Sequence, residues 1–439
     1  MWTFQNWKER ALLPGIKTIQ DVVDWGYCVG CGACFSACDK GVVSLHPIDP
    51  IGIRPRFHGP CSGCRDCLEF CPGYRIDARS SDLGMKNGGN AELLVGPSHE
   101  VWEGFASDEE TRFRGSSGGV LTALSLYCLE KEGMGFVLHT GMDPAHPWRN
   151  TTVVSRTSEE LLERAGSRYA PSSPCEALRK IEESESPCVF IGKPCDAAAV
   201  MMLRKIRPSL DRKLGLVLTF FCAGPPCAGA TASLVEKLGQ DTGKVREIRY
   251  RGCGWPGFFT VRDATGAVTK EITYPESWGY LAKRHRSFRC HLCPDGMGEL
   301  ADISSGDAWH LYRNDGNPGE SVVLARTPRG LDVVRRAIDA GYLTLRPSSP
   351  ERVVSGQGLG RRRAEVHGRL TGLRLFGVPT PEFPGFPIKK AWTHTVPALR
   401  KARVILGTAK RVLLRGLWHK NPVFPFGGFA VGPEAPDGQ

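Results

Sequence analysis

Two runs of closely spaced cysteines near the start of the sequence most constrain what this chain can fold into. Both have the spacing C-x2-C-x2-C-x3-C, at Cys28, Cys31, Cys34 and Cys38 and again at Cys61, Cys64, Cys67 and Cys71. In bacterial ferredoxins this spacing binds two [4Fe–4S] clusters, and the fourth cysteine of each run ligates the other cluster. The pattern therefore predicts one cluster held by Cys28, Cys31, Cys34 and Cys71 and a second held by Cys61, Cys64, Cys67 and Cys38.

Zinc is the alternative metal for such thiols. A zinc site made of four cysteines usually combines two C-x2-C pairs across a spacer, whereas each run here is contiguous. Gly30, Gly32 and Gly63 suit a chain that curls closely round a cluster, because glycine tolerates positive φ. Asp39 stands where the bacterial pattern has proline, which removes no ligand. We expect a ferredoxin-type domain over residues 1–90, with a linker rich in Gly, Ser and Asn at 80–96.

The cysteine count also bears on the cellular compartment. The chain contains 17 cysteines, an odd number, and starts MWTFQNWKERALLPG, which lacks the basic start and apolar run of a signal peptide. No apolar run reaches the roughly 18 residues that a transmembrane helix needs. In a reducing compartment, abundant thiols indicate metal binding more than disulfides. We therefore expect a cytoplasmic protein.

Residues 91–370 alternate between apolar runs and helical patterns. Buried strands are predicted at 135–140, 187–191 and 214–221, and helices at 120–131 and 197–205. This order is typical of an α/β domain, in which ligands gather at the carboxyl ends of the strands. The predicted fold class is thus α+β: a small ferredoxin-like 2[4Fe–4S] domain, an α/β domain and a C-terminal extension.

Four further cysteines occupy positions suited to a third cluster. Cys195 and Cys222 each follow a predicted strand and are expected in turns, and Cys290 and Cys293 form a C-x2-C pair. Four thiolates suffice for another [4Fe–4S] cluster. The alternative is that each is an inert buried thiol, which is the common fate of a single cysteine. That alternative suits Cys128 within a helix and Cys188 within a strand, while Cys175, Cys227 and Cys253 stay unassigned.

A short segment of small residues precedes the helix predicted at 120–131. It reads Phe-Arg-Gly-Ser-Ser-Gly-Gly, with Arg114 as its charged residue and Ser116, Ser117, Gly118 and Gly119 as its last four. The first N–H groups of a helix favour an anion, glycines permit close approach, and arginine binds oxyanions. The segment is consistent with a binding site for a nucleotide phosphate. An ordinary capped helix is the alternative.

Seven short motifs occur in an order that resembles a known family. They are Arg114-Gly-Ser-Ser-Gly-Gly-Val, Gly166-Ser-Arg-Tyr169, Gly192-Lys-Pro-Cys195, Phe221-Cys222, Gly254-Trp-Pro-Gly257, Cys290-x2-Cys293 and Ala301-Asp-Ile-Ser-Ser-Gly-Asp307. Over roughly residues 95–345 the chain resembles the coenzyme F420 hydrogenase/dehydrogenase beta subunit family, in which a ferredoxin-type front end is a common fusion. That family also includes formate dehydrogenase beta subunits, 7-hydroxymethyl chlorophyll a reductase and a divinyl reductase.

The resemblance implies a non-covalent FAD beside a [4Fe–4S] cluster. The cluster would be held by Cys195, Cys222, Cys290 and Cys293. The FAD would be held by Arg114, Ser116, Ser117, Gly118, Gly119 and Thr122, with Asp302, Ser304, Gly306 and Asp307 nearby. Lys193 departs from the threonine common in the family, and its cation would favour an anionic reduced flavin. Candidate catalytic or substrate-facing residues are Lys193, Arg168, Tyr169 and His291, together with Arg251 and Trp255.

The net charge of +11 is concentrated at the C-terminal end. From residue 387 onward, nine Lys and Arg residues oppose only Glu434 and Asp437. Leu399, Leu406 and Leu413 recur at helical spacing among these basic residues, which predicts a basic amphipathic helix within an extension over 371–439. Such a helix suits a membrane surface or an acidic partner, or it packs on the preceding domain with its charges in solvent. No nucleic-acid motif accompanies it.

These observations together predict an iron–sulfur flavoprotein oxidoreductase with FAD and three clusters. Coenzyme F420 is the substrate that the resemblance suggests, and an unsaturated or hydroxymethyl group on a lipid or pigment is an alternative. A second class is an electron-transfer subunit without its own substrate, working with ferredoxin or with a hydrogenase or dehydrogenase subunit. A third is a scaffold with zinc in the cysteine sites. The match fixes the electron path better than the substrate.

Overall fold

The architecture comes from a computed structural model. It describes residues 15–48, 51–59, 66–79, 89–283, 286–313, 316–421 and 423. Cys61, Gly63 and Cys64 of the second cysteine run, and most of the linker predicted at 80–96, lie outside the described residues. The last part of that linker forms helix α5 (Asn90–Val95), which corrects the prediction of an irregular segment there.

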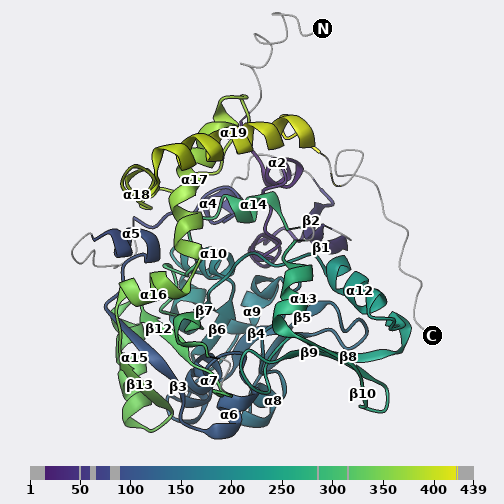
Figure 1. The fold of residues 1–439 in the computed structure, drawn as a ribbon, viewed down its shortest axis with the longest axis vertical. Helices are drawn as coiled ribbons and strands as arrows, with labels where there is room; N and C mark the ends of the chain where they lie inside the picture. Colours follow the sequence, from purple (N-terminus) through teal and green to yellow (C-terminus); the bar gives the residue numbers. More distant parts are fainter. Residues whose placement is uncertain are drawn as a thin grey trace, which may run out of the picture.

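A mixed sheet of eight strands forms the centre of the molecule (Figure 1). Its order is β13 (Leu343–Pro347), β3 (Glu100–Ala106), β12 (Ser321–Ala325), β11 (Ile303–Asp307), β7 (Leu214–Phe220), β6 (Cys188–Gly192), β4 (Val137–Met142) and β5 (Asn150–Ser155). The four strands β11, β7, β6 and β4 run parallel, and the outer strands pair antiparallel. The mixed α/β architecture expected from the alternating pattern is confirmed, including all three predicted strands.

Helices cover both faces of this sheet because alternate residues of each buried strand point to opposite sides. On one face, α7 (Val120–Glu130) and α15 (Pro328–Asp339) pack on Val137, Val189 and Leu216. On the other, α9 (Leu178–Glu182), α10 (Pro194–Leu203) and α11 (Pro208–Lys213) pack on Leu138 and Phe190. Shorter helices α6 (Glu109–Arg114), α8 (Ser158–Glu163) and η1 (Pro174–Ala177) complete these layers.

Helix α10 begins three residues earlier than the sequence predicted. Pro194 occupies its first turn, and the Asp196 carboxylate accepts a hydrogen bond from the Lys193 N–H at 2.9 Å. Proline is favoured at this position because the first helical N–H groups have no partner within the helix. Cys195 therefore lies in the first turn of a helix and not in the preceding turn.

A second, three-stranded sheet stands beside the first. It consists of β8 (Val245–Arg249), β9 (Phe258–Asp263) and β10 (Val268–Thr273), with η2 (Thr242–Lys244) before it. Helices α12 (Ala228–Lys237) and α13 (Tyr274–Leu281) cover it around a small core that includes Tyr250 and Phe259. The short helix α14 (Phe288–His291) follows and carries Cys290.

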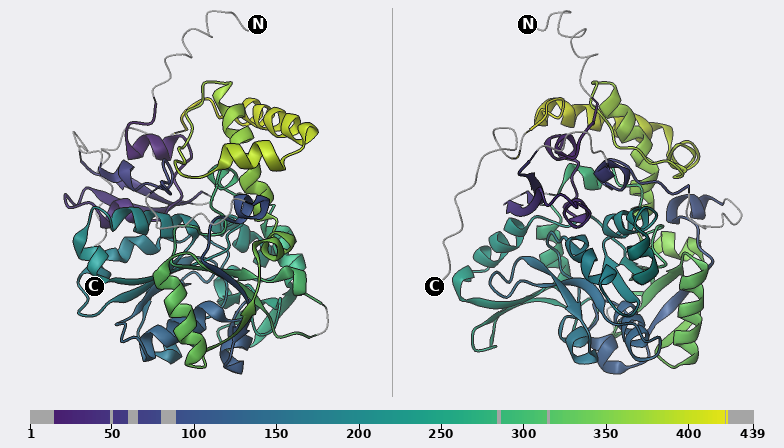
Figure 2. Two further views of the ribbon diagram at one scale, coloured as in Figure 1. Left: turned by 90° about the vertical axis from the view of Figure 1, so that its left-hand side faces the viewer. Right: turned by 180° about the vertical axis from the view of Figure 1, so that it is seen from behind.

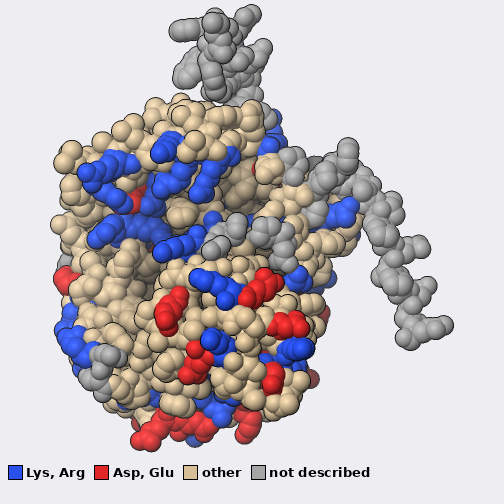
Figure 3. Space-filling view, turned by 45° about the vertical axis from the view of Figure 1, so that its right-hand side comes forward, with Lys and Arg blue, Asp and Glu red and all other residues tan. Residues whose placement is uncertain are grey.

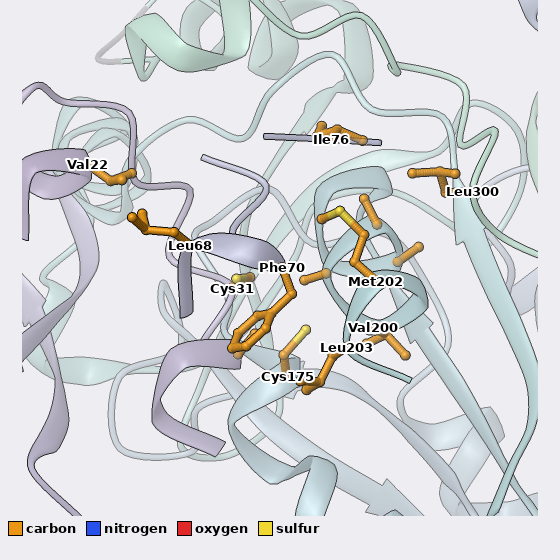
Figure 4. Packing of buried hydrophobic residues seen from close by; sticks show 14 of the residues in the cluster. Val22, Cys31, Leu68, Phe70, Ile76, Cys175, Val200, Met202, Leu203 and Leu300 are labelled. Atoms are coloured by element: carbon orange, nitrogen blue, oxygen red, sulfur yellow. The ribbon is translucent and has the colours of Figure 1, made fainter. Parts of the chain in front are cut away.

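The N-terminal segment packs directly on the central layers. It contains α2 (Ile19–Asp24), α3 (Ala33–Ser36), the hairpin β1 (Val43–Ile48) and β2 (Gly52–Phe57), and α4 (Asp66–Glu69). Figure 4 shows Phe70 and Cys31 of this segment beside Cys175, Met202 and Leu203 of the central layers. One continuous hydrophobic core therefore joins residues 15–79 to α10.

Helices α18 (Ile388–Thr395) and α19 (Ala398–Arg415) lie at the same end of the molecule as the N-terminal segment (Figure 2). Helix α17 (Leu359–Arg374) packs against both of them, and α16 (Pro350–Gly356) lies nearer the central sheet, next to η3 (Trp309–Leu311). The Ile76 N–H donates to the Glu382 carbonyl at 3.0 Å, and the Asn421 N–H donates to the Asp24 carbonyl at 2.7 Å. Among the described helices, none has both the length and the apolar character needed to cross a bilayer.

Candidate functional site

Four cysteines from three separate parts of the chain surround one small cavity of about 60 Å³. Cys195 lies in the first turn of α10, Cys222 follows β7, Cys290 lies in α14 and Cys293 comes just after it. Strands β6 and β7 are parallel neighbours, so their carboxyl ends deliver Cys195 and Cys222 to the same edge of the sheet. These are the four residues predicted as ligands of a third cluster.

Burial governs the chemistry of these thiols. It is the largest cause that raises the pKa of all four, to about 12 for Cys293. Gly224, with a φ of +91°, brings its N–H to the Cys222 sulfur at 3.3 Å. In the described part of the chain, no three or more Cys, His, Asp or Glu side chains come close enough together to hold one metal ion. The thiols surround a space instead of meeting at a point.

A much larger cavity of about 540 Å³ adjoins the small one. Lys193, Cys222, Gly224, Pro225 and Arg362 line both. The larger volume lies in the range of small-molecule and cofactor pockets, which is about 300–1,000 Å³. Its wall includes the serine and glycine segment before α7, at Ser116, Ser117, Gly119 and Thr122, and the end of β11, at Gly306 and Asp307.

The segment before α7 is held in place by its neighbours. Gly119 caps α7 with a φ of +73°, and a side chain at Gly118 would come within 2.6 Å of the Gly104 carbonyl oxygen. The Ser116 hydroxyl accepts from the Ser167 N–H at 2.5 Å, and the Ser117 hydroxyl donates to the Glu320 carbonyl at 2.8 Å. These contacts hold the loop in one position.

Four of the predicted FAD-binding residues do not line the cavity. They are Arg114, Gly118, Asp302 and Ser304. The Arg114 guanidinium pairs with Glu110 at 2.8 Å and is partly exposed. Asp302 accepts from the Val217 N–H at 2.8 Å and from the Thr327 hydroxyl at 2.6 Å, which ties β11 to β7.

Ser304 is likewise used within the sheet. Its hydroxyl accepts from the Arg326 side chain at 3.0 Å, and both residues are buried. Gly118 forms the support behind the loop, where its N–H donates to Ser321 at 2.9 Å. The structure thus gives these residues supporting roles around the cavity.

A buried arginine and a carboxylate close one side of the large cavity. Arg251 pairs with Asp307 through two hydrogen bonds of 3.0 and 2.6 Å, and the Trp255 indole donates to Asp307 at 2.8 Å. The guanidinium also lies over the rings of Tyr274 and Trp309, at 4.6 and 5.3 Å from their centroids. Burial lowers the pKa of Arg251, but Asp307 outweighs that effect, so the net pKa is raised and the charge stays.

Two of the predicted catalytic residues, Lys193 and Tyr169, line the large cavity. Lys193 is buried at the junction of the cavities, where its ammonium contacts Asp196 at 2.7 Å and donates to the Ser172 hydroxyl at 2.8 Å. Burial alone would lower the pKa of Lys193, but the neighbouring Asp196 raises it. Tyr169 lines the large cavity and packs on Trp278 with 4.8 Å between ring centroids.

Arg168 and His291 are engaged elsewhere. Arg168 lines the cavity, but its guanidinium donates to Asn150 at 2.6 Å and to the Pro147 carbonyl at 2.6 Å. His291 lines neither cavity. Burial and the nearby Arg286 lower the pKa of its imidazole to about 4, which keeps the ring neutral at neutral pH.

The first two cysteine runs meet next to the small cavity. Cys28 lines that cavity. Burial and the thiols of Cys31 and Cys28 raise the pKa of Cys71, which places the last cysteine of the second run beside the first run. The predicted exchange of the fourth ligand requires this proximity, and its other half involves Cys61 and Cys64, which lie outside the described residues. Gly30 and Gly32 have φ of +70° and +86°, as the curled chain was expected to require.

Arg289 connects the cysteine motifs. Its side chain is fully buried and donates to the carbonyls of Pro72 and Gly73 at 2.5 and 3.0 Å. Pro72 directly follows Cys71, and Arg289 directly precedes Cys290. This one side chain therefore fixes the second cysteine run against α14. It also lines the small cavity.

Several cavity residues were not predicted from the sequence. His139 and Arg164 come from β4 and from the end of α8, and Arg362 comes from α17, far along the chain from the motifs. Cys175 contacts Cys31, and both are buried. His139 was the most accessible to prediction, because it lies in a strand that ends at the ligand-binding edge.

Comparison with known proteins identifies the family. Two family models, for the N-terminal and the C-terminal parts of the coenzyme F420 hydrogenase/dehydrogenase beta subunit, match residues 101–179 and residues 187–351, respectively. Together these models span more than half of the chain. The chain belongs to the coenzyme F420 hydrogenase/dehydrogenase beta subunit family. The resemblance read from the seven motifs is thereby confirmed, and the family is one of oxidoreductases.

Individual relatives of this family are distant. The coenzyme F420 hydrogenase subunit beta of Methanothermobacter thermautotrophicus is 25% identical over 66% of this chain and 100% of its own length. The coenzyme F420-dependent sulfite reductase of Methanocaldococcus jannaschii is 24% identical over 72% of this chain but only 46% of its own length. A solved structure of the F420-reducing [NiFe] hydrogenase complex from Methanosarcina barkeri has a chain that is 22% identical, with a TM-score of 0.49, over 64% of this chain and 96% of that one.

Proposed function

We propose that this protein is an iron–sulfur flavoprotein that passes electrons between [4Fe–4S] clusters, FAD and a substrate, with coenzyme F420 as the candidate substrate. The observation that carries the proposal is the junction of the two cavities. All four cysteines of the predicted third cluster surround the small one, and the predicted flavin segment lines the large one. Cys222 and Lys193 belong to both, so the two groups would be neighbours.

The residues present suit these cofactors. Four partly buried thiols around a space of about 60 Å³ suit a cluster, which binds one cysteine at each iron atom, better than they suit a single zinc ion. When bound, FAD would supply two-electron hydride chemistry and the clusters would relay single electrons. Burial keeps these thiols neutral when no metal is bound, but a bound metal deprotonates a coordinating thiol, so their raised pKa values do not prevent them from acting as ligands.

The chain's own residues hold and orient these groups. Ser116, Ser117 and Thr122 present hydroxyls at the start of α7, where the helix end favours a phosphate. Arg251, fixed by Asp307, offers a permanent positive charge flanked by aromatic rings. Lys193, paired with Asp196, places a buried cation between the two cavities.

The N-terminal run would hold a cluster next to the third one. Cys28 lines the same small cavity as Cys195 and Cys222, which supports a relay from the front clusters to the flavin site. The full assignment is Cys28, Cys31, Cys34 and Cys71 for the nearer cluster and Cys61, Cys64, Cys67 and Cys38 for the outer one. We further propose that the three parts of the chain, 1–90, 91–370 and 371–439, serve the front clusters, the flavin chemistry and docking, respectively.

The test is anaerobic purification followed by iron, zinc and flavin assays. Three clusters would give about twelve iron atoms with one FAD per chain. Reduced coenzyme F420, reduced nicotinamide and reduced ferredoxin are then mixed separately with the oxidised protein, and bleaching of the flavin absorbance identifies the donor. We expect reduced F420 to bleach it. Zinc in place of iron, with no flavin, would refute the proposal.

An electron-transfer subunit without a substrate of its own is the second candidate. Several similar proteins are named as subunits, including those of coenzyme F420 hydrogenase and F(420)H(2) dehydrogenase. If this candidate is right, the flavin is bleached by none of the small donors and only after a partner oxidoreductase is added. A substrate on a lipid or pigment would instead reoxidise the reduced flavin without a partner protein.

A further inference from the structure

Helix α19 has two apolar stripes on opposite sides. The inner stripe, Val404, Thr408 and Val412, is buried against α17. At Gly372 of α17 the two helices approach so closely that a side chain would come within 2.8 Å of the Thr408 Cβ atom. The inner stripe therefore fixes α19 on the protein and leaves its other side to be explained.

The outer stripe consists of leucines in solvent. Leu399, Leu406, Leu413 and Leu414 have 77%, 68%, 48% and 74% of their surface exposed. The first three are spaced by seven residues, and a helix drifts only about 20° over that interval, so they line one side. Single exposed leucines are common, but a continuous stripe on one helix marks an interaction surface.

Basic side chains without acidic partners accompany these leucines. Arg403, Lys410 and Arg415 are exposed and make no ion pair with any described residue. Residues 387–421 contain no Asp or Glu at all. Arg400, by contrast, pairs with Glu365 at 2.6 Å. Figure 3 shows that Lys and Arg gather over the upper part of the molecule while Asp and Glu gather below.

We propose that the outer face of α19, formed by Leu399, Arg403, Leu406, Lys410, Leu413 and Leu414, binds the surface of a membrane that contains anionic lipids. The leucines would enter the boundary between headgroups and acyl chains, and the basic residues would contact the headgroup phosphates. Helix α19 lies along one end of the molecule (Figure 1). Exposed Lys389 and Lys390 of α18 add positive charge at the same end.

Two other occupants fit these observations less well. A second copy of the chain would bring the Arg403 and Lys410 side chains of two molecules together, and like charges repel. An acidic protein would neutralise the charges, but would also need an apolar groove to cover four leucines. An anionic bilayer supplies both an apolar layer and negative charge without a shaped groove.

The experiment is flotation of the full-length protein with vesicles of phosphatidylcholine alone and of phosphatidylcholine with phosphatidylglycerol. We expect binding only to the mixed vesicles. Arg403→Gln with Lys410→Gln should weaken binding about thirtyfold, because each basic residue near an anionic surface contributes about 1 kcal/mol. The control is Lys131→Gln with Lys244→Gln, which removes the same charge from exposed positions on other elements and should leave binding unchanged.

A second variant separates the leucines from the charges. Leu399→Ser with Leu406→Ser and Leu413→Ser keeps every basic residue and should also abolish flotation, while circular dichroism and the thermal midpoint stay as in the wild type. Equal binding to both vesicle types, or unaltered binding of either variant, overturns the proposal. Two further results overturn it. In one, the wild-type protein does not float and is a dimer that the leucine variant converts to a monomer. In the other, the wild-type protein does not float and binds polyglutamate through Arg403 and Lys410.

Discussion

Cys195 is the residue on which the third cluster can be tested most sharply. It lines the small cavity together with Cys227, which lies at the start of α12 and is not among the predicted ligands. We expect Cys195→Ser to lose about four of the twelve iron atoms, one cluster's worth, and Cys227→Ser to keep them all. Iron and acid-labile sulfide assays after anaerobic purification measure this. Equal iron in the two variants would contradict the ligand assignment.

His139 links the large cavity to the pH dependence of stability. It is buried, its Nε2 contacts the Ser155 hydroxyl at 2.8 Å, and burial with the nearby Arg164 lowers its pKa from 6.5 to about 4. Above pH 6.5 the ring is neutral in both folded and unfolded chains, so its effect on stability is constant. Between pH 6.5 and 4 the unfolded chain binds a proton that the folded protein does not, which costs up to about 3 kcal/mol of stability.

The variant His139→Gln removes this titration and retains a side chain that can hydrogen-bond to Ser155. We expect the free energy of unfolding of the wild type to fall more steeply from pH 6.5 to 4 than that of the variant. Urea titrations at several pH values measure both curves. Parallel curves over this range would show that the neutral imidazole is not what the fold requires at this position.

At the scale of the element, the loop before α7 depends on backbone shape. A Cβ atom at Gly119 would lie 2.6 Å from the Thr111 carbonyl oxygen, and its φ is +73°. Gly133, just beyond the other end of α7, has a φ of +65°, but a Cβ atom there would have no neighbour within 4 Å. The pair therefore separates the cost of positive φ, about 1 kcal/mol, from the cost of a steric clash.

We expect Gly119→Ala to lose FAD during gel filtration and to lower the thermal midpoint by clearly more than Gly133→Ala does. Gly133→Ala should keep its full flavin content. The flavin absorbance per chain and the melting curve are the two measurements. Retention of FAD by Gly119→Ala, with normal stability, would mean that the loop does not hold the cofactor.

The same elements show how far the sequence could be interpreted. The buried strands β4, β6 and β7 were predictable because they are short apolar runs, and the cysteines at their ends follow from the ligand edge of a parallel sheet. Asp302 and Ser304 do not line the cavity because they lie at or just before the start of β11, whereas Ser305, Gly306 and Asp307 at its carboxyl end do, and motif order carries no information on where along the strand the cavity begins. Arg362 reaches both cavities from α17 only through tertiary packing, which no local pattern records.

At the scale of the whole molecule, the N-terminal segment is not an appendage on the central α/β layers. Val22, Tyr27, Phe70 and Ile76 are almost fully buried in a core that also contains Val200, Leu300 and Val366. A ferredoxin-type domain joined by a free linker would bury its own apolar residues. The spacing of the cysteines is a local pattern from which clusters can be predicted. The shared core could not be predicted in this way, because it depends on contacts between segments hundreds of residues apart.

This shared core makes a prediction about a shortened chain. Burial of each large apolar side chain contributes about 1.5–3 kcal/mol, and a protein's total stability is only about 5–15 kcal/mol. A chain that begins at residue 89 exposes the partners of Val22, Tyr27, Phe70 and Ile76, and also removes the carbonyls that Arg289 binds. We therefore expect it to aggregate, or to melt without a cooperative transition in calorimetry, even when iron and FAD are supplied. A soluble shortened chain that melts cooperatively at the wild-type temperature would instead establish that residues 89–439 fold without the N-terminal segment, and that segment would then be an added module.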